Sequence, residues 1–172
     1  INGVSFQVFY DDGNSANNRD IVMFHGNDSN ISSAFDPDFW SATLNGINYQ
    51  GGPASVVLGV ADGQTFSDAP VYFNNTSNVL FPADSFSGTN NPGGASGLYD
   101  MREADIAGFL GLGTNNCRIF TTAVVGDCLG LITATFDLPA GAAPSQPTVP
   151  EPTAMLLLGT TFGLAARRLR RR

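Results

Sequence analysis

The chain has 172 residues, enough for one folded domain plus an appendage, and its apolar fraction of 42% is ordinary for a globular protein. Only 13% of the residues are charged, lysine is absent, and fourteen acidic residues with three arginines before Val149 give that part a formal net charge of −11. So acidic a body excludes nucleic acid as a partner, because phosphate groups require lysine and arginine.

Short apolar or alternating segments, separated by turns rich in Gly and Asn, predict a mainly β body. The expected strands cover residues 4–10, 21–24, 40–49, 55–61, 70–73, 78–81, 118–125 and 129–138. Within the third of them, Asn45-Gly46 is a hairpin dipeptide and is expected to break the strand. Many short strands of this kind indicate a β-sandwich or jelly-roll-like body.

The last predicted strand has the clearest alternation. The residues expected to face the core are Ile132, Ala134, Phe136 and Leu138. Residues 99–110 are the exception to the β pattern, because Met, Arg, Glu and Ala favour one short helix there. Gly111 and Gly113 are expected to end that helix.

The chain contains two cysteines, Cys117 and Cys128. In an exported protein such a pair is expected to form a disulfide, and closing a loop of that length would stabilise the fold by about 3 kcal/mol. Two unpaired thiols are the alternative. The chain opens on Ile1 without an initiator Met or a leader peptide, so we expect it to be a fragment.

Composition divides the chain into three parts. Residues 1–138 form the predicted β-rich body, residues 139–148 are a linker rich in Pro and Ala, and residues 149–172 form a distinct tail. The tail begins with Val149, Pro150, Glu151 and Pro152, continues with an apolar stretch at residues 153–166, and ends in a basic cluster. That cluster consists of Arg167, Arg168, Arg170, Arg171 and Arg172.

Each part of the tail has a physical interpretation. Two prolines around Glu151 keep the chain extended, which is the form that a processing enzyme can grip. The apolar stretch is expected to be helical, and the arginines should stay on the cytoplasmic side of a membrane. Fourteen helical residues span about 21 Å at ~1.5 Å per residue, whereas a hydrocarbon core is about 30 Å thick. This predicts a transient membrane anchor in which the acidic body faces outward.

These three elements, in this order, resemble the PEP-CTERM sorting signal of Gram-negative bacteria that produce exopolysaccharide. The resemblance rests on residues 149–152, the apolar stretch and the terminal arginines. It implies that the protein is exported, is held briefly in the inner membrane, and is processed near the Pro-Glu-Pro motif by the membrane protease exosortase. It further implies a destination at the cell surface or in the extracellular matrix. It does not define the activity of the body.

The body carries little recognisable catalytic chemistry. His25 is the only histidine, and its position after an apolar strand superficially matches an α/β-hydrolase, but that fold needs a G-x-S-x-G motif and a later His, both absent here. One His and two Cys exclude the common zinc sites. Glu103 is the only Glu of the body, and no acidic pair stands out as a glycoside hydrolase site. We therefore expect no enzymatic activity and no required cofactor.

Calcium is a weaker possibility, because two loops are rich in oxygen ligands. One holds Asp11, Asp12, Asn14 and Asp20, and the other holds Asp28, Asp36 and Asp38. Neither matches an EF-hand, and solvated turns are the simpler interpretation.

Three roles for the body remain open. The first is a non-enzymatic surface or matrix protein associated with exopolysaccharide and biofilm. The second is a carbohydrate-binding module, with or without bound calcium, and the third is a small hydrolase. Trp40, Tyr49, Tyr72 and Tyr99 would have to be exposed to form a sugar-stacking platform, whereas aromatic residues of this kind more often belong to the core.

Overall fold

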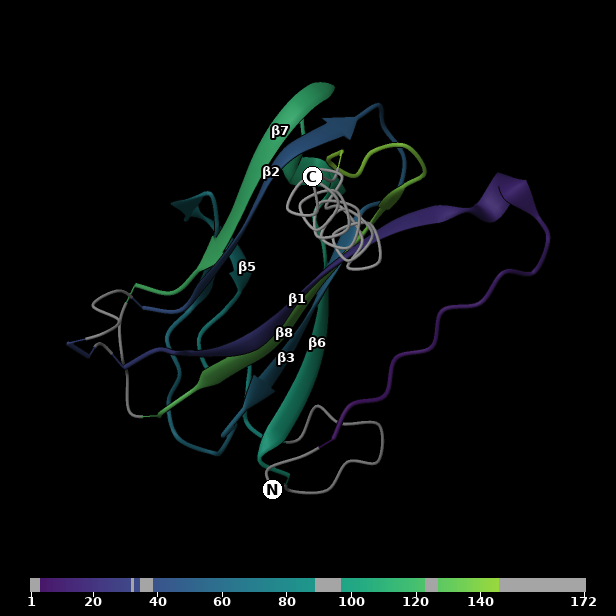
Figure 1. The fold of residues 1–172 in the computed structure, drawn as a ribbon. Helices are drawn as coiled ribbons and strands as arrows, with labels where there is room; N and C mark the ends of the chain where they lie inside the picture. The colour runs from purple at the N-terminus through teal and green to yellow at the C-terminus, as the bar shows by residue number, and fades with distance from the viewer. Residues whose placement is uncertain (1–3, 32, 35–38, 89–96, 123–126, 146–172) are drawn as a thin grey trace, which may run out of the picture.

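Two four-stranded antiparallel sheets make up the body in the computed structural model, which describes residues 4–31, 33–34, 39–88, 97–122 and 127–145 (Figure 1). One sheet has the order β1-β8-β3-β6 and the other the order β2-β7-β4-β5. The strands are β1 Arg19–Ser29, β2 Ser41–Tyr49, β3 Ser55–Ala61, β4 Val71–Phe73, β5 Asn75–Phe81, β6 Tyr99–Asp105, β7 Gly113–Phe120 and β8 Gly130–Pro139. Two 3-10 turns, η1 Ser15–Asn17 and η2 Ala107–Phe109, complete the elements.

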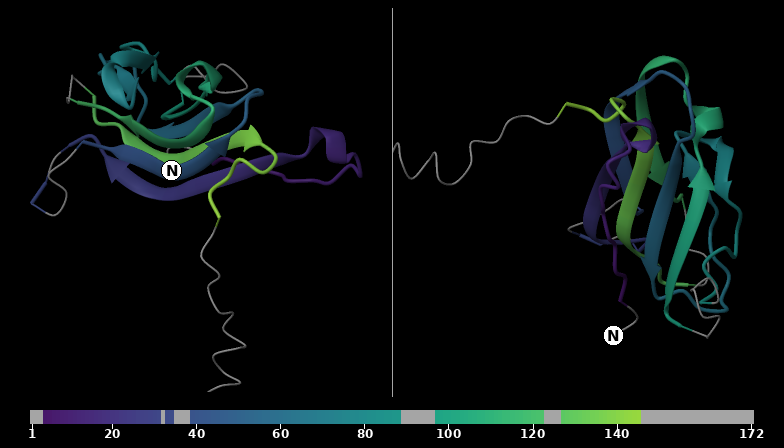
Figure 2. Two further views of the ribbon diagram at one scale, coloured as in Figure 1. Left: turned by 90° about the horizontal axis from the view of Figure 1, so that it is seen from above. Right: turned by 90° about the vertical axis from the view of Figure 1, so that its right-hand side faces the viewer.

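The sheets stack as two layers, which confirms the predicted β-sandwich (Figure 2). The strand order of the two sheets is that of an eight-stranded jelly roll. Odd-numbered strands finish, and even-numbered strands begin, at the same end of the sandwich, which we call the distal end. β8 therefore runs from the distal end to the opposite, proximal end, where the chain leaves the body.

The core lies between the two sheets. β3 and β8 are the central strands of their sheet, and most of their residues are buried. Trp40, Ile47, Phe73 and Ile119 fill the opposite layer and have essentially no exposed surface. Burying such large apolar side chains stabilises the fold by about 1.5–3 kcal/mol each.

A β-bulge in β8 changes the alternation predicted for that strand. Ala134, Phe136 and Leu138 are buried as expected, but Ile132 is only half-buried and Leu131 occupies the core instead. The register with β3 shifts at this point, because Gly59 pairs with Thr133 while Val60 pairs with Leu131. An extra residue in one strand turns every following side chain to the other face.

Asn45-Gly46 does not form the predicted hairpin. β2 is continuous through both residues, and a register shift against β7 lies between Asn45 and Ile47. Gly46 has a φ of +81°, and its N–H donates to Asn116 Oδ1 at 3.0 Å. The glycine thus allows a bulge inside a paired strand, since a positive φ is as compatible with a bulge as with a turn.

The predicted helix at residues 99–110 is also wrong. Tyr99–Asp105 forms the edge strand β6, paired along its whole length with β3, and only the single turn η2 follows. Helix propensity is a weak preference of less than 1 kcal/mol per residue, and the ladder to β3 outweighs it.

The first predicted strand does not join either sheet. Residues 4–10 have no assigned strand, and Val4, Phe6 and Val8 are largely exposed. Ser5 and Gln7 are half-buried, and Gln7 Nε2 donates to Thr135 Oγ1 on the outer face of β8 at 3.2 Å. The alternation is present, but its polar residues face the body.

Candidate functional site

The tail starts at a root that is fixed to the proximal end of the body. After β8, the N–H of Ala142 donates to the carbonyl of Pro139 at 3.0 Å, and Ala142 is buried. The carbonyl of Ala142 accepts from Asn48 N–H at 2.9 Å, and Ala143 N–H donates to Asp20 Oδ2 at 2.9 Å. Residues 139–143, which the sequence assigned to the linker, therefore pack on the body.

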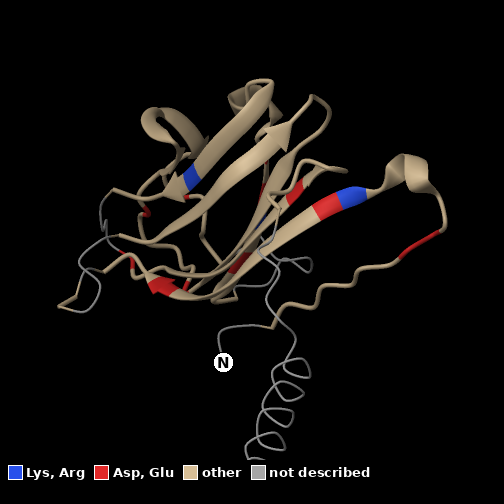
Figure 3. Ribbon diagram, turned by 45° about the horizontal axis from the view of Figure 1, so that its top comes forward, with Lys and Arg blue, Asp and Glu red and all other residues tan. Residues whose placement is uncertain are grey.

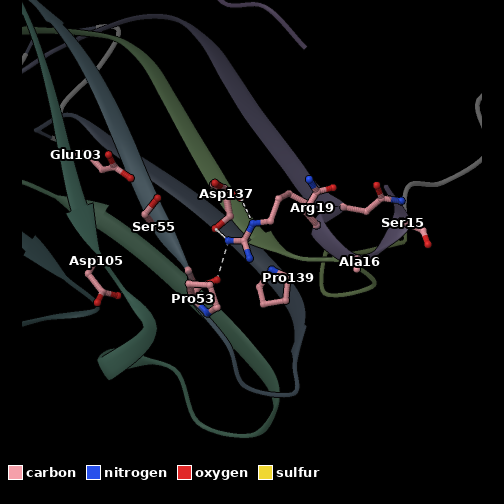
Figure 4. Close-up of a pocket in the computed structure, with 13 residues that line it drawn as sticks. Ser15, Ala16, Arg19, Pro53, Ser55, Glu103, Asp105, Asp137 and Pro139 are labelled. Carbon is pink, nitrogen blue, oxygen red and sulfur yellow. Dashed lines mark hydrogen bonds and ion pairs between the residues drawn. The ribbon is translucent and has the colours of Figure 1, made fainter. Parts of the chain in front are cut away.

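A groove of about 670 Å³ lies beside this root, on the outer face of the sheet that contains β8 (Figure 4). We call it the root groove. It is lined by Ser15, Ala16, Asn17, Asn18, Arg19, Pro53, Ala54, Ser55, Glu103, Asp105, Asp137, Pro139 and Ala140. Cross-strand pairing brings these residues together, because Asp137 of β8 and Asp105 of β6 both lie opposite Ser55 of β3.

Arg19 is the one cation among the described residues that line the root groove. Its Nε lies 2.6 Å from Asp137 Oδ1, and its Nη2 donates to the carbonyl of Pro53 at 2.7 Å (Figure 4). The Arg19 and Asp137 side chains are 27% and 38% exposed, so solvent screens the pair, which contributes no more than about 1 kcal/mol. Asp105 Oδ1 accepts from Ala107 N–H at 2.8 Å. Two of the three acids in the groove thus have structural partners.

The four residues considered as a sugar-stacking platform lie mostly inside the body. Trp40, Tyr49 and Tyr99 are buried, and Tyr72 is half-buried with its ring 5.7 Å from that of Phe120. None of the four lines the root groove. This burial removes the main support that the sequence offered for a carbohydrate-binding module.

The carboxylates of the first predicted calcium loop mainly stabilise local turns. Asp11 and Asp12 each accept a backbone N–H two residues later, and hydrogen bonds from Asn17 and the backbone lower the pKa of Asp12. Asp20 binds Ala143 of the tail root. In the second loop, Asp28 Oδ2 accepts from Ser41 N–H at 2.8 Å, while Asp36 and Asp38 lie outside the described residues.

The predicted disulfide is not formed in the structure. Cys117 is buried in β7, Cys128 is exposed just before β8, and both are free thiols. Burial raises the pKa of the Cys117 thiol to about 12, so this group stays protonated and unreactive at neutral pH. His25 is exposed within β1.

The sorting elements themselves, residues 149–152 and the arginines at 167–172, lie outside the described residues. Neither 3-10 turn in the described part of the chain is long or apolar enough to cross a membrane.

Sequence comparison assigns the tail to a class of export and sorting signals. Residues 148–172 match the family model of the PEP-CTERM protein-sorting motif, in agreement with the resemblance seen in residues 149–172. The chain is therefore a PEP-CTERM sorting-domain-containing protein, and the motif supports exosortase-dependent sorting of an exported protein. Among curated proteins, none matches this chain in sequence.

Sequence reasoning missed the root groove and two buried aspartates, Asp68 and Asp127. Arg19 and Asp137 are 118 positions apart, so only strand pairing reveals their contact. Asp68 and Asp127 carry no motif, and both are buried in connections between strands at the distal end. The only available signal was the position of each aspartate next to an apolar segment.

Proposed function

We propose that this protein reaches the cell surface or the extracellular matrix as a non-enzymatic structural component, after exosortase has processed its tail. The match of residues 148–172 to the sorting motif is the observation that carries this proposal. Export places the body outside the cytoplasm, where a compact acidic sandwich stays soluble through its net charge.

The geometry of the root supports the membrane stage of this proposal. The folded part ends at residues 139–143, only a few residues before Pro150, so the chain between the root and the motif is short. An apolar stretch of about 21 Å anchors weakly, and each of five arginines near an anionic leaflet adds roughly 1 kcal/mol. Such an anchor holds the protein for processing and releases the body once the chain is cut.

The composition of the root groove supports a non-enzymatic role. Its lining contributes carboxylates, serines, asparagines and one arginine, and Arg19 already neutralises Asp137. The three acids Glu103, Asp105 and Asp137 do share one groove, which is the observation that favours a small glycoside hydrolase as second candidate. Asp105 and Asp137 are occupied by Ala107 and Arg19, so the structural role is the better supported one.

The sorting step is tested by expressing the full precursor in a host that has exosortase and in the same host without it. The parent should lose its C-terminal segment, seen as a fall in mass, and appear outside the inner membrane. Glu151→Gln should remain at full mass in the membrane fraction. Pro147→Ala, in the linker, is the matched control and should be processed as the parent is. Release of the Glu151 variant at the parental level would refute the role of the motif.

The role of the body is tested with polysaccharide extracted from the matrix of the host. We expect the protein to co-sediment with this polysaccharide without releasing new reducing ends. Failure to co-sediment would contradict the matrix association. Reducing ends that appear with the parent and not with Glu103→Gln would establish the hydrolase instead.

A further inference from the structure

Six aspartates of the described residues gather at the distal end of the sandwich, far from the root groove. They are Asp28, Asp62, Asp68, Asp84, Asp100 and Asp127, and each lies within a few residues of the strand ends that meet there. Acidic positions outnumber basic ones over the body as a whole (Figure 3). Such a cluster is not a binding site in itself, because most exposed acids are simply solvated.

Two of these aspartates are buried, and each has one oxygen without a hydrogen-bond partner among the residues that the structure describes. Asp68 is 2% exposed: its Oδ2 accepts from Phe86 N–H at 3.1 Å, and its Oδ1 has no hydrogen bond. Asp127 is 3% exposed: its Oδ1 accepts from Cys128 N–H at 2.8 Å, and its Oδ2 has no hydrogen bond. Buried polar atoms are almost always satisfied, so two such oxygens at one end of the fold need an explanation.

The negative charges of other distal aspartates act on Asp68. Burial is the main cause that raises the pKa of Asp68 to about 6, and the negative charges of Asp127, Asp84 and Asp100 raise it further. Arg102, the arginine in contact with this region, donates to the carbonyl of Ser85 at 3.0 Å and lies over the ring of Phe81. A buried carboxylate without a cation costs several kcal/mol, so a bound positive charge would relieve both groups at once.

We propose that Asp68 and Asp127 bind one divalent cation of the calcium type at the distal end. Free carboxylate oxygens are hard ligands, and calcium accepts six to eight of them, including backbone carbonyls, hydroxyls and waters. Among the described residues no three acidic, His or Cys side chains converge as a metal site, so the other ligands come from those neutral groups. Thr121 Oγ1, buried without a hydrogen bond at the distal end of β7, is one such oxygen.

This site differs from the two loops that the sequence suggested. The described carboxylates of those loops accept backbone N–H groups and are not deeply buried. At the distal end, by contrast, each of the two buried aspartates keeps one oxygen for a ligand. The rival explanation is a proton held on Asp68, and it predicts no response to calcium.

The test uses the full chain in mild detergent, with calcium or a chelator and no other ligand. Calcium at about 100 times its Kd should raise the Tm by roughly 5–10 °C. Terbium, which replaces calcium, should luminesce on excitation of Trp40, because this only Trp is buried next to β2 at the distal end, and excess calcium should abolish the signal. The terbium measurement on the parent needs no variant.

Asp68→Asn and Asp127→Asn should each abolish the calcium-dependent rise in Tm. In chelator, Asp68→Asn should be at least as stable as the parent, since it removes a buried charge. Asp12→Asn, in the exposed first loop, is the matched control and should respond to calcium as the parent does. A parent whose Tm and terbium signal do not respond to calcium, or an Asp68→Asn variant that keeps the response, would overturn the proposal.

Discussion

At the scale of single residues, the structure places charge where the sequence gives no sign of it. Arg19 and Asp137 form an ion pair between two neighbouring strands, and Asp68 is buried in the connection between β3 and β4. Neither fact follows from composition, because both depend on which strands pair. The terminal arginines, by contrast, could be interpreted from sequence alone, since their meaning depends on their order behind an apolar stretch.

Asp68 should make stability depend on pH when calcium is absent. Its folded pKa of about 6 exceeds the unfolded value near 3.8, so the folded state binds the proton more tightly. This group therefore favours folding below about pH 4, and its contribution is lost as the pH rises through about 6. Asp68→Asn removes the effect, and its advantage over the parent should grow by up to about 3 kcal/mol between those limits.

Urea unfolding of both proteins in chelator, across this pH range, measures that advantage. A constant difference between parent and variant would show that Asp68 titrates normally.

At the scale of elements, the hydrophobic pattern located several strands well, but it did not locate the turns and bulges reliably. β3 was predicted with its observed bounds, and β8 within one residue at either end. Two of the errors lie where one glycine or one run of helix formers is compatible with two structures. Gly46 provides a bulge instead of a hairpin, and the helix formers of β6 are used by the ladder to β3. Local preference could not settle either case, because tertiary pairing decides it.

Gly59, in the middle of β3, leaves room on the outer face of the sheet for side chains from the neighbouring strands β6 and β8. A Cβ at this position would collide with Tyr99 Oη and Thr133 Oγ1, and both side chains are buried. We expect Gly59→Ala to destabilise the fold by about 1–3 kcal/mol through overpacking. The control is Gly108→Ala in η2, where no atom lies within 4 Å of the added Cβ and the change should stay within about 0.5 kcal/mol.

Denaturant unfolding of both glycine variants gives the two values. Equal stability of Gly59→Ala and Gly108→Ala would mean that Tyr99 moves aside without cost.

At the scale of the whole molecule, the sequence predicted a β-rich body followed by a separate sorting tail. The structure confirms a mainly β body with two antiparallel sheets, and residues 148–172 match the sorting motif. The boundary between the two is less sharp than composition suggested. Pro, Ala and Gly at residues 139–143 look like a linker, yet Ala142 is buried and Asp20 holds Ala143. Small residues serve a packed turn as well as an extended linker, so composition alone does not distinguish them.

Two truncated chains test whether the folded body ends at Leu138 or includes residues 139–143. A chain that ends at Ser145 should unfold as cooperatively as the full chain in detergent. A chain that ends at Leu138 loses the buried Ala142 and the hydrogen bonds to Asn48 and Asp20, and should be about 2–3 kcal/mol less stable. Thermal and urea unfolding of both chains measure the difference. Equal stability would place residues 139–143 in the linker after all.

The direction of β8 has a consequence for how the protein is displayed. This strand begins among the buried aspartates and finishes beside the root, about 33 Å away for ten residues at ~3.3 Å each. While the tail is tethered, the aspartate-bearing pole is the part of the molecule farthest from the tether. Cleavage of the tail changes only the proximal end. A molecule that recognises the distal end therefore encounters the same surface before and after release.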